Sequence, residues 1–427
     1  MKIQERPKLK KIIAVVVGVL LITASFFCGF FIKDCINGRD ILSNNEILNY
    51  LNEYGVFNTD TLELEKFSVS EITRSFVENL NDDYAHYYTK EEYEKIKDNA
   101  DGEYEDVGIS VFADTFKVYK VDINSPAYHA GVLENDIVKS AEYNGKIKTF
   151  SKQGDFKDFV KEIPENVEFN LVIERKGSLK RLKLSKRDFI LTYVYYQDSE
   201  KALAYLSDGD KIKLTETDKR VEEIPNDTAY VSLRQFEGDC ASQLENVLEY
   251  AVENGKTKLI FDLRFNGGGY MTALEDVSSI MINVKENSSS VITYSMNAKG
   301  EYTPYTASRS GYVSGIEKIS VLANEYTASA SECLIGAMLY YKNGFDESRL
   351  IIENSSLLDG KAKTYGKGIM QTTFPLSDGG ALKLTTAIIY QPDKTTCIHK
   401  SGITASGQNA LLREDGNAIL RAKQVLA

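Results

Sequence analysis

The first pattern along the chain is a long apolar run near the N-terminus, which contains no charged side chain from Ile12 to Ile32. At about 1.5 Å per helical residue, this run would span roughly 32 Å, the thickness of a hydrocarbon core. It predicts a transmembrane anchor over 12–32. A cleaved signal peptide is the alternative, but its apolar core would be shorter and would end in small residues. This run ends in Phe26-Phe27-Cys28-Gly29-Phe30-Phe31.

Basic residues precede the apolar run and predict its orientation. They are Lys2, Arg6, Lys8, Lys10 and Lys11, and Glu5 is the only acid among them. Positive charge favours the cytoplasmic side of a membrane. We therefore expect residues 1–11 to be a cytoplasmic tail and the chain from Lys33 onward to be extracytoplasmic, because no second apolar run of this length follows.

The rest of the chain shows three further patterns. Residues 33–100 have helical periodicity, with Thr89 as a helix N-cap before Lys90-Glu91-Glu92, and the helices within 40–100 could mediate a homodimer. Residues 101–188 read as short strands with small helices, including a hairpin around Lys176-Gly177. Residues 189–427 alternate strand and helix, which predicts an α/β layer with functional groups at the carboxyl ends of its strands. The predicted fold class is therefore multidomain α/β and α+β.

Composition narrows the chemistry. The net charge of −11 makes nucleic acid an improbable partner, since the body of the chain has no Lys/Arg-rich patch. The five cysteines form no C-x-x-C pair, which speaks against a zinc finger or a disulfide framework. There are only three histidines, His86, His129 and His399, and none lies within the candidate motifs below, so a Ser-His-Asp triad would have to recruit one from the N-terminal half or His399 from the C-terminal part. No cofactor or metal is implied.

The first candidate motif is Asp262-Leu263-Arg264-Phe265-Asn266-Gly267-Gly268-Gly269. Glycines after a buried strand let the backbone reach φ > 0 and approach another group closely. The freed N–H groups could bind an oxyanion. A nucleotide-binding loop is the competing interpretation, but its usual glycine spacing and Lys-Ser/Thr ending are absent. A purely structural tight turn stays open.

Two more motifs carry a hydroxyl and an amine. Ser329 lies in Thr327-Ala328-Ser329-Ala330-Ser331-Glu332 at a strand-to-helix junction, where a serine is either an N-cap or a nucleophile with helix N–H groups nearby. Lys367 lies in Gly366-Lys367-Gly368, which is either a surface turn or the setting of a base. As a base, its pKa must fall from about 10.4 towards ~7–8, and burial has that sign. Gln371 could hold the amine.

Together these motifs resemble the C-terminal processing, or tail-specific, serine peptidases, whose signature orders D-L-R-x-N-G-G-G, S-A-S-E and G-K-G-x-x-Q as this chain does. The resemblance implies a PDZ-like domain over 101–188 and a crotonase-like or ClpP-like peptidase core over 189–427, anchored in a bacterial cell membrane. It implies Ser329 as nucleophile, Lys367 as general base and Gln371 as the residue that orients the lysine. The oxyanion hole would be the N–H groups of Gly268, Gly269 and Ala330. The substrates would be proteins or peptides with free C-terminal tails.

Three positions depart from the family pattern. Tyr340 replaces an acid that some members have in the helix after the serine, residues 343–363 contain an insertion, and Asn135 stands where a glycine is common. The first two motivate an alternative: a catalytically inactive, membrane-tethered peptide-binding protein. A cysteine hydrolase using Cys333 is a third reading, but it lacks a nearby histidine.

Overall fold

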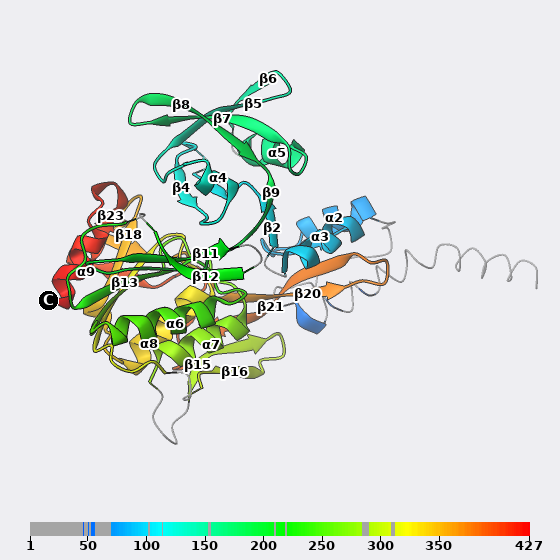
Figure 1. The fold of residues 1–427 in the computed structure, drawn as a ribbon. Helices are drawn as coiled ribbons and strands as arrows, with labels where there is room; N and C mark the ends of the chain where they lie inside the picture. The colour runs from blue at the N-terminus through cyan, green and yellow to red at the C-terminus, as the bar shows by residue number, and fades with distance from the viewer. Residues whose placement is uncertain are drawn as a thin grey trace, which may run out of the picture. The chain divides into compact units, whose positions relative to one another are not determined.

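The computed structural model describes residues 46, 50, 53–55 and 70–427, apart from 101–102, 113, 153–154, 209–210, 218–219, 284–289 and 309–311. The chain divides into two compact units (Figure 1). The first combines residues 1–95 with 371–387, and the second combines 96–370 with 388–427. The predicted anchor over 12–32 lies outside the described residues. No helix within the described ranges is long and apolar enough to cross a membrane.

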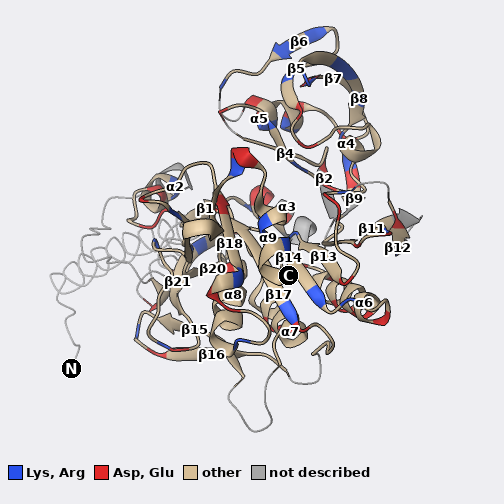
Figure 2. Cartoon of the chain, turned by 90° about the vertical axis from the view of Figure 1, so that its left-hand side faces the viewer, with Lys and Arg blue, Asp and Glu red and all other residues tan. Residues whose placement is uncertain are grey.

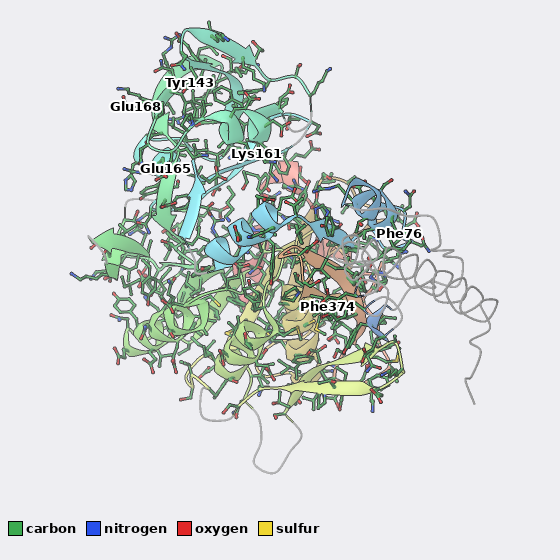
Figure 3. All side chains as sticks on the ribbon, turned by 90° about the vertical axis from the view of Figure 1, so that its right-hand side faces the viewer. Phe76, Tyr143, Lys161, Glu165, Glu168 and Phe374 are labelled. Atoms are coloured by element: carbon green, nitrogen blue, oxygen red, sulfur yellow. The ribbon has the colours of Figure 1, made fainter. Side chains whose placement is uncertain are left out.

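The first unit brings together segments from the two ends of the chain. Strand β1 (His86–Tyr88) pairs antiparallel with β21 (Ala381–Tyr390), and β20 (Ile369–Pro375) also pairs with β21. Buried Asp82 fixes this pairing, since its carboxylate accepts both the N–H and the hydroxyl of Thr385 at 2.9 Å. Helix α2 (Ser70–Glu78) contributes to the same core, against which Phe76 and Phe374 pack (Figure 3).

Helix α3 (Lys90–Ala100) confirms the predicted N-cap at Thr89. The Thr89 hydroxyl accepts the Glu92 N–H at 3.3 Å, and the Glu92 carboxylate accepts the Thr89 N–H at 2.9 Å. This reciprocal pair is a capping box, which satisfies two N–H groups that the helix itself cannot.

Residues 109–185 of the second unit form what we call the β3–β8 segment, and its elements agree with the predicted strands and helices. They are β3 (Ile109–Val111), β4 (Val118–Val121), α4 (Pro126–His129), β5 (Ile137–Tyr143), β6 (Lys146–Thr149), α5 (Asp155–Glu162), β7 (Glu168–Arg175) and β8 (Ser178–Ser185). The four-stranded sheet has the order β6-β5-β7-β8, and β3 pairs with β4. The hairpin at Lys176-Gly177 is confirmed, with φ values of 49° and 78°.

Apolar side chains from these strands and from α5 fill a core of their own. Charged side chains stay outside: Lys161 of α5 and Glu168 of β7 are exposed (Figure 3). Strands β6 and β8 carry several Lys and Arg residues on this surface (Figure 2). Next to the segment, β2 (Glu103–Asp106) pairs with β9 (Arg187–Ile190).

The larger part of the second unit is built on an eight-stranded sheet with the order β12-β11-β10-β13-β14-β17-β18-β23. Its antiparallel end consists of β10 (Val194–Gln197), β11 (Ala202–Asp208) and β12 (Lys211–Glu216). Its parallel strands are β13 (Thr228–Leu233), β14 (Lys258–Asp262), β17 (Lys318–Asn324), β18 (Leu350–Asn354) and β23 (Ala410–Leu412). The predicted α/β alternation is therefore confirmed.

Helices cover both faces of this sheet (Figure 1). Helices α6 (Cys240–Glu253), α7 (Met271–Met281) and α8 (Ala330–Tyr341) share one core with Leu259 and Phe261 of β14. Helix α9 (Ala418–Leu426) shares the opposite core with Ile260. Alternate residues of β14 thus face opposite layers, as the two-residue period of a strand requires.

Two smaller strand pairings also belong to the second unit. Strands β15 (Val291–Asn297) and β16 (Tyr302–Thr306) form a hairpin, and β19 (Lys361–Lys363) pairs with β22 (Thr404–Ser406). The loops that follow β14 and β17 carry the first two candidate motifs, at the carboxyl ends of parallel strands, where open α/β sheets place their sites.

Candidate active site

Ser329 immediately precedes α8 in an unusual backbone conformation. Its φ and ψ are 55° and −118°, a region that residues with a side chain rarely adopt. Hydrogen bonds hold this turn on both sides, since the Ala328 N–H donates to the Asn266 carbonyl and the Cys333 N–H donates to the Ser329 carbonyl, each at 3.0 Å. Such backbone strain costs on the order of 1–3 kcal/mol and persists only where the surroundings impose it. A sharp strand-to-helix turn of this kind is how α/β-hydrolases present a nucleophilic serine.

The glycine loop after β14 packs directly against this serine. A Cβ on Gly268 would lie 2.8 Å from the Ser329 Cβ and 2.9 Å from both the Ala328 oxygen and the Ala330 nitrogen. A Cβ on Gly269 would lie 2.2 Å from the Phe236 oxygen. Both glycines also have positive φ, 99° and 152°. Only glycine fits at either position, so the loop is more than an ordinary turn.

The three N–H groups predicted to bind an oxyanion differ in their availability. The Gly268 N–H donates to the Asn266 side-chain oxygen at 2.9 Å, so it is already engaged. The N–H groups of Gly269 and Ala330 have no acceptor in the part of the chain that the structure describes. In this structure the Gly268 N–H is therefore engaged while two neighbouring N–H groups stay available, and which of the three would bind an oxyanion stays a prediction.

Glu332 is the residue whose importance the sequence reasoning missed. Its side chain is fully buried, and its Oε2 accepts the N–H groups of Ser329 and Lys367, each at 2.9 Å. Because both bonds end on one oxygen, the two backbone nitrogens lie within twice that distance of each other. Its Oε1 accepts the Gly366 N–H at 2.8 Å and the Thr364 hydroxyl at 2.5 Å.

Two opposing effects act on the pKa of Glu332. Burial raises the pKa of its carboxyl, while the four donors act in the opposite direction. Hydrogen bonds to a charged acceptor contribute about 1.5–3 kcal/mol each, which is how a buried carboxylate is tolerated. A glutamate three residues after a serine is the usual sign of a capping box, and this was the sequence signal available. Nothing local in the sequence showed that residues 364–367 would share it.

The segment around Lys367 is part of the interior and is not the surface turn that flanking glycines suggest. Gly366 and Gly368 are buried, and Lys367 is partly buried. A Cβ on Gly368 would lie 2.5 Å from the His399 nitrogen, and the Lys400 N–H donates to the Gly366 carbonyl at 2.7 Å. The glycines therefore make room for residues 398–402. The structure thus brings Ser329, Gly269, Ala330 and the Lys367 backbone together.

Gln371 is the third residue of β20, four positions after Lys367. Its side-chain Nε2 is buried and has no hydrogen-bond partner among the described residues. Its predicted role in orienting Lys367 stays a prediction.

Asp262 and Arg264, from the Asp-Leu-Arg part of the first motif, form a hydrogen-bond network at the start of the glycine loop. Arg264 donates to both carboxylate oxygens of Asp262 at 2.6–3.0 Å and to Glu353 at 2.8 Å. The Tyr230 hydroxyl donates to Asp262 at 2.6 Å. Burial alone would raise the pKa of Asp262, but Arg264 and Tyr230 hold it below its ordinary value. This network ties together the ends of β13, β14 and β18.

Aromatic rings from the β3–β8 segment contact the loops beside the site. The Tyr119 ring stacks on Phe265, with ring centres 5.0 Å apart, and on Tyr326 at 6.1 Å. Tyr119, Phe265 and Arg264 also line a cavity of about 140 Å³. Phe265 precedes the glycines and Tyr326 precedes Ser329, so this segment touches both loops that form the site.

The competing chemistries find little support in the geometry. Cys333 is buried in α8, and burial raises the pKa of its thiol to about 12, which disfavours the thiolate that a cysteine hydrolase needs. Tyr340, where the resemblance led us to expect an acid, is 55% exposed.

Comparison with known proteins agrees with this architecture. The model of peptidase family S41 matches residues 227–406, which contain all three motifs. A "Probable CtpA-like serine protease" of Staphylococcus aureus (strain COL) is 26% identical over 403 residues, covering 92% of this chain and 71% of that protein. Its counterpart from Staphylococcus saprophyticus is 26% identical over 332 residues, covering 77% and 58%.

Solved structures show the same fold. The photosystem II D1 C-terminal processing protease superposes with a TM-score of 0.56 at 20% identity, over 90% of this chain and 96% of that one. An S41 protease from Bacteroides fragilis gives a TM-score of 0.54 at 14% identity, over 88% and 91%. Residues 227–406, which hold every motif, match peptidase family S41, and CtpA-like relatives align along most of the sequence, so the chain is identified as a serine-type peptidase.

Proposed function

We propose that this chain hydrolyses peptide bonds through an acyl-enzyme formed on Ser329, with Lys367 as the general base. Ser329 would attack the substrate carbonyl and pass its proton to the neutral Lys367 amine, which would then protonate the leaving amine. Water would release the acyl group by the reverse route. One observation carries this proposal: a single oxygen of Glu332 binds the N–H groups of both Ser329 and Lys367.

The oxyanion of the tetrahedral intermediate would lie between the N–H groups of Gly269 and Ala330. The Gly268 N–H already has an acceptor, whereas the other two N–H groups have none among the described residues. Ala330 also opens α8, and the N-terminus of a helix favours negative charge. Gln371 would orient Lys367.

Substrate delivery is proposed to use the β3–β8 segment as a PDZ-like domain. An extended tail would add to the edge of β3 as a further strand, in the manner of known strand-addition domains. The anchor predicted over 12–32 would hold the peptidase on the outer side of a bacterial cell membrane, where its protein or peptide substrates would be. Self-association through residues 40–100 stays a prediction.

Replacing the nucleophile tests the proposal. The Ser329→Ala variant should lose cleavage of an unfolded protein substrate, while the exposed Ser355→Ala control should cleave at the wild-type rate. Lys367→Ala should behave like Ser329→Ala, and the exposed Lys361→Ala should not. Undiminished cleavage by Ser329→Ala would remove the assignment.

A serine-reactive fluorophosphonate separates this proposal from a non-catalytic scaffold. The probe should label the wild-type chain and leave Ser329→Ala unlabelled. A folded wild-type chain that takes no label and cleaves nothing would favour the peptide-binding alternative.

A further inference from the structure

Strand β3 has one edge that is open to a ligand. On its other edge, the Asp122 N–H donates to the Gly108 carbonyl and the Phe112 N–H donates to the Lys117 carbonyl, so residues 108, 110 and 112 face β4. Backbone groups alternate between the two edges of a strand. Those of Ile109 and Val111 therefore face away from β4, and β3 pairs with no other strand of the described chain. This is the edge to which a tail would add.

The end of such a tail would lie at the turn before β3. A tail that runs antiparallel to β3 ends beside the N-terminal end of that strand, at residues 106–108. Backbone N–H groups in a turn at this place are the usual receptor of a terminal carboxylate. Gly108 has φ of 75°, and a Cβ there would lie 2.1 Å from the Ser125 Cβ, so the turn is tightly held.

The N–H groups of this turn are already engaged by a carboxylate from the chain itself. Asp106 Oδ1 accepts the Val107 N–H at 2.5 Å. The N–H of Gly108 also stabilises the charged form of Asp106. The Asp106 carboxylate thus makes the contacts that an incoming terminal carboxylate would need.

Nearby charged residues further disfavour binding of a terminal carboxylate beside Asp106. Asp106 as a whole is exposed, but desolvation of its carboxyl raises the pKa of Asp106, and the nearby charge of Asp122 acts in the same direction. The positive charge of Lys120 is engaged in an ion pair with Asp122 at 2.8 Å. Lys186 acts in the opposite direction on Asp106. A bound terminal carboxylate would add a further negative charge beside Asp106 and Asp122.

We propose that Asp106 is a specificity-determining residue that competes with the terminal carboxylate of a tail. The ligand that fits β3 best is then an extended peptide that brings no negative charge to the turn, such as an internal segment of a protein. A free C-terminus gives no advantage in binding, because it must displace Asp106 first. This inference rests on the proposed strand addition to β3 and refines which peptides it accepts.

Paired peptide libraries test the inference on the full-length chain carrying Ser329→Ala, which prevents cleavage. The two libraries share every sequence and differ only in a free or an amidated C-terminus. Dissociation constants of the best binders, measured by fluorescence anisotropy, give an acid-to-amide preference for each protein variant. Asp106→Ala frees the two N–H groups, and Asp114→Ala, an exposed residue between β3 and β4, makes the same change in net charge as a control.

We expect no preference for the free acid in the Asp106-containing chain or in Asp114→Ala. Asp106→Ala should prefer the acid by roughly tenfold or more, the usual effect of hydrogen bonds to a charged group. Asp106→Asn should fall between them, because its side-chain oxygen still accepts a hydrogen bond. Circular dichroism confirms that each variant is folded.

Two other results would overturn the inference, and they differ in what else they affect. A strong preference for the acid that is equal in the Asp106-containing chain and in Asp106→Ala leaves tail recognition intact and removes the role of Asp106. If neither library binds any variant, strand addition to β3 itself fails, and the role of Asp106 fails with it. Proteolysis by the wild-type chain is measured separately and is untouched by either result.

Discussion

Glu332 offers the sharpest test of how the site is assembled, because its four partners are all donors. Replacement by Gln leaves one accepting oxygen and one donating nitrogen. If the nitrogen replaced Oε2, the N–H groups of both Ser329 and Lys367 would lose their acceptor. If it replaced Oε1, only the Gly366 N–H would be stranded, since the Thr364 hydroxyl can turn and accept. The second orientation is therefore favoured.

The expected loss of stability in Glu332→Gln follows from placing its amide nitrogen at the Oε1 position. One buried N–H without an acceptor costs about 1–3 kcal/mol. The remaining bonds lose their charge assistance, but removing a buried charge offsets part of that loss. We expect Glu332→Gln to lose about 1–3 kcal/mol of unfolding free energy and to keep cleavage within roughly tenfold of wild type, because the shared oxygen stays in place. Glu332→Leu strands all four donors and should lose cleavage altogether.

Urea unfolding, performed with Ser329→Ala present to prevent self-cleavage, measures the stability of these variants. Steady-state cleavage of a fluorogenic peptide, with Ser329 intact, measures their activity. Glu347→Gln, at an exposed glutamate, is the matched control and should match wild type in both assays. The reasoning fails if Glu332→Leu cleaves as fast as Glu332→Gln, because a shared carboxylate would then not hold the Ser329 and Lys367 segments together.

Three further predictions address the loop, the titration and the supporting network. Gly268→Ala should abolish cleavage and lower the free energy of unfolding by more than the ~1–3 kcal/mol of backbone strain alone, because its Cβ would clash with Ser329. Gly255→Ala, with φ of 73° and open space around it, should cost only the strain. Equal losses for the two variants in urea unfolding would contradict the clash at Gly268. Burial raises the pKa of Glu332 and Glu353 above 4.5, so folding takes up protons, and the free energy of unfolding should fall as pH rises from 4.5 through the folded pKa values. Glu332→Gln should flatten this pH dependence in urea unfolding. The same pH dependence in wild type and Glu332→Gln would argue against the contribution of Glu332. Tyr230→Phe should cost about 1–2 kcal/mol by removing a donor to Asp262, and an unchanged urea midpoint would show that Arg264 alone suffices.

The sequence predicted the elements that depend on local patterns. Thr89 caps a helix because the residues that satisfy its first turn lie within four positions, and Lys176-Gly177 turns a hairpin because its backbone needs are local. The alternation of strand and helix also placed Ser329 and Gly269 correctly on loops that follow strands. These features depend on near neighbours, which a single sequence displays.

Contacts between residues far apart in the sequence could not be predicted from local patterns. Three of the four partners of Glu332 lie more than thirty residues away, at 364–367, and the glycines beside Lys367 are explained only by residues 398–402. Gly268 was predicted to donate to an oxyanion because glycine loops often do, and the side chain of Asn266, two residues earlier, uses that N–H instead. Local patterns indicated which residues matter, and the fold determined what each one does.

The pairing of β1 with β21 has a consequence for biosynthesis. Residue 86 meets residue 383, so β1 leaves the ribosome long before its partner strand has been made. The stretch translated in between includes Ser329 and Lys367. A nascent chain must therefore carry β1 with an unsatisfied edge until translation is nearly finished, and the last strand to arrive closes the first unit.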